Sequence, residues 1–213
     1  KKYERIRPAL NILMDQAKEI MNSTYRYVDG EERLYLSDDR YVKINLASSG
    51  QQEVVWVFNL LFYYLSEDKK IFLIIEEPES HLFPKSQKYI TELIALVNNC
   101  GHSIVLTTHS PYVLGTLNNL LYAKTISPQA RKEANKIIRE SLWLDYNAFD
   151  SWFVKNGTIE NCMDADIHMI QNEKIDEISK VINEDFERLL EMKKNNRKTH
   201  SKSIEKSIVK SYD

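Results

Sequence analysis

The sequence predicts an α/β fold in which helices flank a parallel sheet, and three observations lead to this prediction. Residues 71–75 (IFLII) and 103–108 (SIVLTT) are short, apolar and rich in β-branched residues, as buried strands are. Residues 86–99 between them have helical spacing and end at Cys100-Gly101, a typical helix stop. A strand, a helix and a second strand joined by short links are the pattern of a parallel, doubly wound sheet.

The segments before this unit have their own patterns. Residues 5–21 carry apolar side chains at helical spacing, which predicts a helix. Residues 25–46 alternate apolar and polar side chains around the turn signals Asp29-Gly30 and Asp38-Asp39, which predicts a short antiparallel meander. The small residues ASSG then lead into an apolar run, residues 54–65, that suits a buried helix.

The segments after the unit are less regular. Ser110-Pro111 can open a helix, and residues 175–190 carry one apolar helical stripe. After Met192 the chain is polar and basic, and we expect it to be weakly ordered. We therefore predict four regions: a helix and meander over 1–46, a core over 47–126, a mostly helical extension over 127–192 and a basic tail over 193–213.

Composition limits the possible functions. The 213 residues are 43% hydrophobic and 28% charged, and the formal net charge of −2 creates no global field toward nucleic acid or membrane. No apolar run approaches the length of a membrane span. The two cysteines, Cys100 and Cys162, suit a reducing compartment, so we expect a cytoplasmic protein. The first residue is Lys1 and not Met, so we expect the C-terminal part of a longer protein.

Three short segments contain candidate functional residues. Glu76 and Glu77 directly follow the first strand, where α/β proteins bind ligands, and a magnesium ion with phosphates would compensate their charge. Ser48, Ser49, Gly50 and Gln51 precede a helix, whose N-terminus favours anions. His109 ends the second strand. Each segment also has a purely structural interpretation: a solvated strand end, a serine-rich helix cap and a structural histidine.

Taken together and in this order, these segments resemble the C-terminal half of an ABC-type ATPase domain. Residues 47–51 (ASSGQ) are similar to the signature motif, and residues 71–77 to the Walker B strand with its catalytic glutamate. Residues 79–83 fall where the D-loop lies, and His109 matches the switch histidine. The segment EEPESHLFP, residues 76–84, is most similar to the SMC/OLD-like branch of this family. That branch includes ATPases of DNA repair and of bacterial phage defence.

The resemblance implies roles for these residues. Glu76 would hold magnesium through a water, Glu77 would orient and deprotonate the attacking water, and His109 would sense the γ-phosphate. The segment Ser48–Gln51 would cover the ATP bound to an opposite protomer, so that ATP joins a homodimer or a pair of ATPase domains. DNA and a partner nuclease or effector protein are further partners that the resemblance implies, and a membrane is not.

Two departures from the family pattern stand out. Walker B has Glu76 where aspartate is usual, and the sequence contains no G-x-x-x-x-G-K-[ST] loop around any of its five glycines. The phosphate-binding half must then lie upstream or on another chain.

Alternative interpretations remain. A non-hydrolysing regulatory or scaffold module would use the same fold. The triplet Asp164-Ala165-Asp166 has the D-x-D pattern of a Toprim nuclease, although a turn or helix cap explains it better. His168 and His200 have no metal-ligand spacing, which argues against a zinc site.

Overall fold

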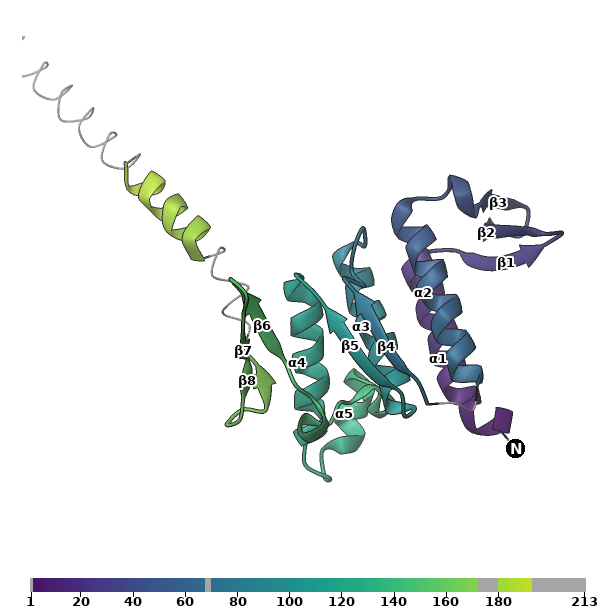
Figure 1. Ribbon diagram of the computed structural model, residues 1–213. Helices are drawn as coiled ribbons and strands as arrows, with labels where there is room; N and C mark the ends of the chain where they lie inside the picture. Colours follow the sequence, from purple (N-terminus) through teal and green to yellow (C-terminus); the bar gives the residue numbers. More distant parts are fainter. Residues whose placement is uncertain (1, 68–69, 172–179, 193–213) are drawn as a thin grey trace, which may run out of the picture. The chain divides into compact units, whose positions relative to one another are not determined.

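The computed structural model describes residues 2–67, 70–171 and 180–192. The chain divides into two compact units, Lys1–Asn172 and Glu173–Asp213, and each is described by itself. Figure 1 shows the order of the elements along the first unit.

The N-terminal part of the first unit has the predicted helix, meander and helix. Its elements are α1 (Lys2–Met21), β1 (Thr24–Val28), β2 (Glu31–Ser37), β3 (Arg40–Lys43), the 3₁₀ helix η1 (Ile44–Leu46) and α2 (Ser49–Ser66). The three strands form one antiparallel sheet in chain order. Asp29 and Gly30 both have positive φ, 52° and 80°, as the tight turn of a hairpin requires.

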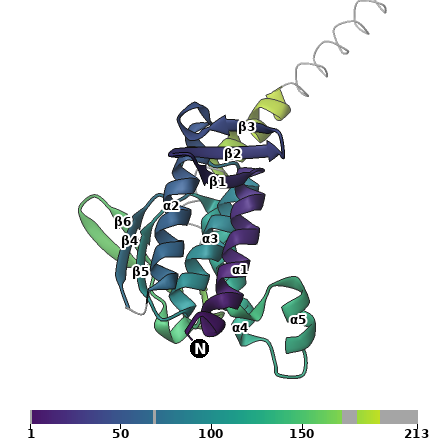
Figure 2. The same ribbon diagram turned by 90° about the vertical axis from the view of Figure 1, so that its right-hand side faces the viewer.

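The apolar stripe of α1 explains how this part packs. Leu13, Leu61 and Leu93 are fully or almost fully buried, and they come from α1, α2 and the next helix, α3 (Pro84–Asn99). Contacts join α1 to both α2 and α3, and Figure 2 shows the three helices side by side. Burying such side chains is the main stabilising contribution to this layer, at roughly 1.5–3 kcal/mol for each leucine.

The predicted strand–helix–strand unit is also present. β4 (Phe72–Glu76) and β5 (Ser103–Thr107) pair in parallel, with Ile74 opposite Val105, and α3 connects them. The helix α4 (Pro111–Thr125) follows and packs against α3. The prediction of an α/β fold with a parallel sheet, helices and a short antiparallel meander is therefore confirmed.

The expectation that both of these strands are buried is wrong for the residues described. Along β4 and β5 every second side chain is exposed, including Phe72 at 66%, Ile74 at 61% and Val105 at 46%. The other face holds Ile75, which is 8% exposed. An unbroken apolar run is the sequence pattern of a strand covered on both faces, whereas helices of the described chain cover only one.

The prediction of a mostly helical extension over 127–192 is wrong for residues 150–170. The short elements here are α5 (Arg131–Ile137), η2 (Glu140–Leu142), η3 (Tyr146–Ala148), β6 (Trp152–Lys155), β7 (Thr158–Asn161), β8 (Met163–Asp164) and β9 (Met169–Ile170). Asn156 and Gly157 have positive φ, 52° and 75°, and form the turn between β6 and β7. An Asn-Gly pair between alternating strands is the strongest short hairpin signal, and the helical interpretation overlooked it.

The triplet at 164–166 lies in a turn. The carboxylate oxygen Oδ1 of Asp164 accepts hydrogen bonds from the backbone N–H groups of Asp166, at 3.0 Å, and Ile167, at 3.2 Å. This is the local turn geometry that aspartate favours, so the turn interpretation of this triplet is confirmed.

The second unit is described only over residues 180–192, which are helical and exposed. The predicted helix begins at 175, in a stretch outside the described residues, and the predicted basic tail at 193–213 also lies outside them. No helix in the described part of the chain has both the length and the apolar content to cross a bilayer.

His102, between α3 and β5, leads to a prediction about pH. Its side chain is 7% exposed, and its Nδ1 is buried without a hydrogen-bond partner among the described residues. This burial lowers the pKa of His102 below its ordinary value, because the charged ring is poorly solvated. The unfolded chain therefore binds a proton at His102 more readily than the folded chain does, and the free energy of unfolding falls as pH drops below about 6.5.

Replacing His102 with glutamine removes this titration, so the variant is expected to lose less unfolding free energy between pH 7.5 and pH 5.5 than the wild type. Urea unfolding at both pH values measures the difference, and other acid-sensitive groups cancel in the comparison. Equal losses in the two proteins would contradict the prediction.

Candidate functional site

Glu76 and Glu77 lie at the carboxyl end of β4, and both are exposed. Glu76 is in register with Thr107, the last residue of β5. The backbone N–H of Glu77 donates to the carbonyl oxygen of Thr107 at 3.0 Å, so parallel pairing continues one residue beyond the strand. Glu77 then turns the chain with a φ of 42°, a conformation that costs a non-glycine residue of order 1–3 kcal/mol and often occurs at functional sites.

His109 lies beside Glu77. Its ring Nε2 is 3.2 Å from Oε1 of Glu77, and its side chain is 86% exposed. The other carboxylate oxygen of Glu77 accepts a long hydrogen bond from the Ser80 hydroxyl, at 3.4 Å. The carboxyl ends of two neighbouring parallel strands meet at one edge of a sheet, and this topology brings together three of the predicted site residues, Glu76, Glu77 and His109.

The predicted signature residues form the beginning of α2. Ser48 is the N-cap, and Ser48 and Ser49 are exposed. Ser48 and Gln51 form a reciprocal capping box, and the amide Nε2 of Gln51 also donates to the carbonyl oxygen of Met21 at 2.9 Å. Gln51 therefore ties the start of α2 to the end of α1, while the two serines face solvent beside a helix N-terminus, where backbone N–H groups can meet an anion.

Gly50 has a packing role that the sequence did not indicate. A Cβ atom at this position would lie 2.5 Å from the carbonyl oxygen of His81, so no side chain fits there. His81 has a φ of 58°, and its ring Nδ1 is 2.9 Å from Oε1 of Glu53 on α2. The start of α2 is therefore in close contact with the turn 77–82 of the same chain. In the described part of the chain, no hydrogen bond or ion pair joins Ser48, Ser49, Gly50 or Gln51 directly to Glu77 or His109.

The sequence placed Glu79 in the segment similar to the D-loop but assigned no contact to Glu79 or Thr108, and these two residues connect the same turn to the loop after β5. The hydroxyl of Thr108 donates to Oε1 of Glu79 at 2.5 Å, and the backbone N–H of His109 donates to the same oxygen at 3.0 Å. Glu79 lies two residues after Glu77, and Thr108 directly precedes His109. Their positions beside these predicted site residues are the sequence signal that could have identified them.

A cleft of about 290 Å³ lies between α2 and the end of β4. Its lining includes the carboxylates Glu53, Glu76 and Glu77 together with the apolar side chains of Trp56 and Leu82, and no lysine or arginine of the described chain contributes to it. A cleft of this charge repels phosphates unless cations neutralise them.

The carboxylate oxygens of this cleft could hold magnesium only together with further ligands. No cluster of three or more His, Cys, Asp or Glu side chains among the described residues could hold a metal ion. Magnesium, however, is commonly held by one or two carboxylates together with waters and the phosphates of a nucleotide. Glu76 and Glu77 supply such oxygens, so the site suits an ion that enters with ATP.

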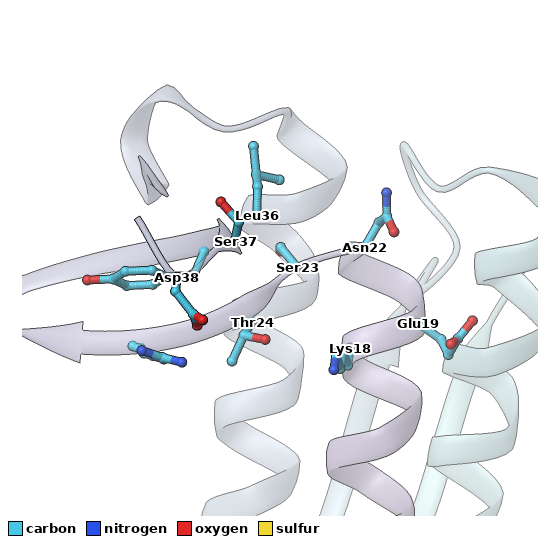
Figure 3. A pocket seen from close by; sticks show the side chains of 10 residues that line it. Lys18, Glu19, Asn22, Ser23, Thr24, Leu36, Ser37 and Asp38 are labelled. Atoms are coloured by element: carbon cyan, nitrogen blue, oxygen red, sulfur yellow. The ribbon is translucent and has the colours of Figure 1, made fainter. Parts of the chain in front are cut away.

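A second cleft of about 290 Å³ lies between the end of α1 and the meander. Figure 3 shows Lys18 on the last turn of α1, Asn22 directly after this helix, and Ser37 and Asp38 at the end of β2 and just beyond it. Positive and negative side chains both line it, including Lys18, Arg26, Glu19 and Asp38, so its charge favours neither anions nor cations.

Three comparisons with known proteins bear on this site. Residues 1–114 match the family model described as AAA ATPase domain. An uncharacterized protein of Methanocaldococcus jannaschii is 24% identical over 82 residues, which is 38% of this chain and 10% of that protein. The chain thus spans about a tenth of the length of the curated relative that it matches.

Among solved structures, a chain from a study of ATP-driven dimerization and DNA-stimulated activation of SMC ATPases is similar, with a TM-score of 0.45 and 12% sequence identity. That match covers 86% of this chain and 98% of the other. The family model covers more than half of the sequence and includes residues 47–51, Glu76, Glu77 and His109, and it confirms the prediction of an ATPase domain. The chain belongs to the AAA ATPase domain family.

Proposed function

We propose that this chain supplies the hydrolytic half of an ATPase site of ABC type, and that a P-loop segment must join it to form the complete site. The observation that supports this most directly is the pairing of Glu77 with His109 at the carboxyl ends of β4 and β5. Glu77 is the base that orients the attacking water and accepts its proton, and His109 contacts the γ-phosphate. Glu76 holds magnesium, which neutralises the phosphate charge when it is bound.

Two features support the need for a P-loop segment. The cleft between α2 and the end of β4 has no lysine or arginine of the described chain in its lining. Phosphoryl transfer, however, requires positive charge around the phosphates. The exposed apolar face of β4 and β5, with Phe72, Ile74 and Val105, is the kind of surface that a further layer of the same domain covers. We propose that the P-loop segment, with its own strand and helix, packs on this face.

The partners follow from the same proposal. Ser48, Ser49, Gly50 and Gln51 contact ATP bound to a second protomer, so that ATP and magnesium together drive dimerisation. The core of this module is residues 47–126. The motif EEPESHLFP supports a cytoplasmic role in DNA repair or in phage defence, in which the ATPase acts on DNA or controls a nuclease or other effector.

Calorimetry with ATP and magnesium tests the need for the P-loop segment. The chain by itself is expected to bind ATP with a dissociation constant above about 1 mM, because most phosphate contacts come from a P-loop. Addition of the P-loop segment of the same ATPase is expected to bring the constant into the micromolar range. Micromolar binding by the chain alone would contradict the proposal.

A charged substitution on the exposed face tests where that segment packs. Ile74→Asp is expected to weaken association with the P-loop segment at least about 100-fold, because the new carboxylate would be buried without a partner. Val154→Asp on β6 is the matched control, since Val154 is exposed to a similar extent, 71% against 61% for Ile74. Equal association of the two variants would show that the segment does not cover this face.

A further inference from the structure

We propose that Glu79 is a positioning residue that holds His109 against Glu77 and connects the start of α2 to this pair. The proposal rests on the proposed function only in that Glu77 and His109 are taken as the hydrolytic pair. The contacts of Glu79 are independent of that assignment.

Glu79 is buried, with 8% of its surface exposed, although it is an acid in an otherwise exposed turn. Its Oε1 accepts two hydrogen bonds, from the Thr108 hydroxyl at 2.5 Å and from the backbone N–H of His109 at 3.0 Å. The Thr108 hydroxyl oxygen in turn accepts from the backbone N–H of Ser110 at 3.0 Å. One carboxylate therefore fixes three consecutive residues of the loop that carries the histidine.

The bond to the backbone of His109 matters because the side chain is 86% exposed, so packing contributes little to holding the ring in place. The distance between His109 and Glu77 is then determined by their backbones. Glu77 and Glu79 belong to one turn, in which Ser80 N–H donates to the Glu77 carbonyl at 2.9 Å and Leu82 N–H donates to the Glu79 carbonyl at 3.0 Å. Glu79 thus joins the backbone of the histidine to the turn that carries the base.

The same turn contacts α2 on its other side. His81 meets Gly50 through its carbonyl oxygen and Glu53 through its ring. A displacement of the start of α2 would therefore move the turn, and through Glu79 it would move His109. This contact path lets the segment Ser48–Gln51, at the start of α2, affect the geometry of the hydrolytic pair.

The second oxygen of Glu79, Oε2, is buried without a hydrogen-bond partner in the described part of the chain. A glutamine could replace the acceptor at Oε1 but would place an NH₂ donor where Oε2 lies. Glu79→Gln therefore keeps the link to His109 and removes the charge, whereas Glu79→Ala removes the link itself.

The test follows the ring of His109 by nuclear magnetic resonance, using ¹⁵N-labelled histidine in the 213-residue chain. In Glu79→Ala the His109 ring signal is expected to shift and broaden, while that of His168, whose ring lies against Tyr146, stays in place. In Glu79→Gln the His109 signal is expected to remain close to its wild-type position. An unmoved His109 signal in a folded Glu79→Ala protein would overturn the proposal.

Thr108→Val provides a second variant if Glu79→Ala does not fold. It removes only the hydroxyl that joins Glu79 to Ser110, and a smaller shift of the same His109 signal is expected. An unchanged signal in this variant would also overturn the proposal, since it would show that the loop keeps its position without this connection.

Kinetics of the complete ATPase separate this proposal from the proposed function. Glu79→Ala is expected to lower kcat about 10- to 100-fold with little change in the KM for ATP, because displacement of catalytic groups by about 1 Å has effects of this size. An inactive wild-type protein would refute the proposed function and leave the resonance result standing. A wild-type kcat in Glu79→Ala, with ATPase activity present, would refute the positioning role.

Discussion

Replacing Glu77 with glutamine is expected to lower ATP turnover of the complete ATPase by about 100-fold or more while ATP binding persists. Glutamine has nearly the same shape as glutamate but cannot accept the proton of the attacking water, and a general base contributes roughly 10²–10⁴-fold. The backbone pairing of residue 77 with Thr107 is unaffected by the change. The nucleotide-bound dimer should therefore accumulate, which light scattering with ATP and magnesium can measure alongside phosphate release.

The matched control is Glu133→Gln on α5, where the carboxylate is exposed and pairs with Lys136 of the same helix. Its turnover is expected to equal that of the wild type. Wild-type turnover in Glu77→Gln would show that Glu77 is not the base. The non-hydrolysing scaffold interpretation predicts instead that the wild type and both variants bind ATP equally and that none of them releases phosphate.

The second large effect is expected from Gly50→Ala. The added methyl group would lie 2.5 Å from the carbonyl oxygen of His81, so either the turn 77–82 or the start of α2 must move. Overpacking of this kind costs about 1–3 kcal/mol of unfolding free energy. Because His81 and Glu79 belong to the same turn, turnover is expected to fall as well.

Gly115→Ala is the control for this substitution. Gly115 lies inside α4, and a Cβ atom there would have no heavy atom within 4 Å beyond its own helix and chain neighbours. Alanine is favoured over glycine in a helix interior by about 0.5–1 kcal/mol, so this variant should be slightly more stable than the wild type. Chemical denaturation of the three proteins gives both values, and equal stability of Gly50→Ala and Gly115→Ala would contradict the predicted close contact.

Much of the fold followed from local signals in the sequence. Helical spacing predicted α1 and α3, alternation around Asp29-Gly30 predicted the meander, and two short apolar runs predicted β4 and β5. Each of these signals acts over a few residues, which is why it can be read without tertiary information. The Asn156-Gly157 hairpin carries an equally local signal, and its omission was an error of interpretation.

The sequence by itself also determined which side chains lie at the strand ends, since Glu76, Glu77 and His109 lie at the ends of β4 and β5 or within two residues of them. Only the tertiary structure decided how these residues are held. The contact between Gly50 and His81 joins positions 31 residues apart, and α3 and β5 separate Glu79 from the loop that carries His109. Such contacts depend on how α2 and β5 pack beside the turn, and no periodicity or motif encodes that packing. The exposed face of β4 has the same physical origin: its apolar sequence indicates a covering layer, but only the packing of the described helices shows which face they cover.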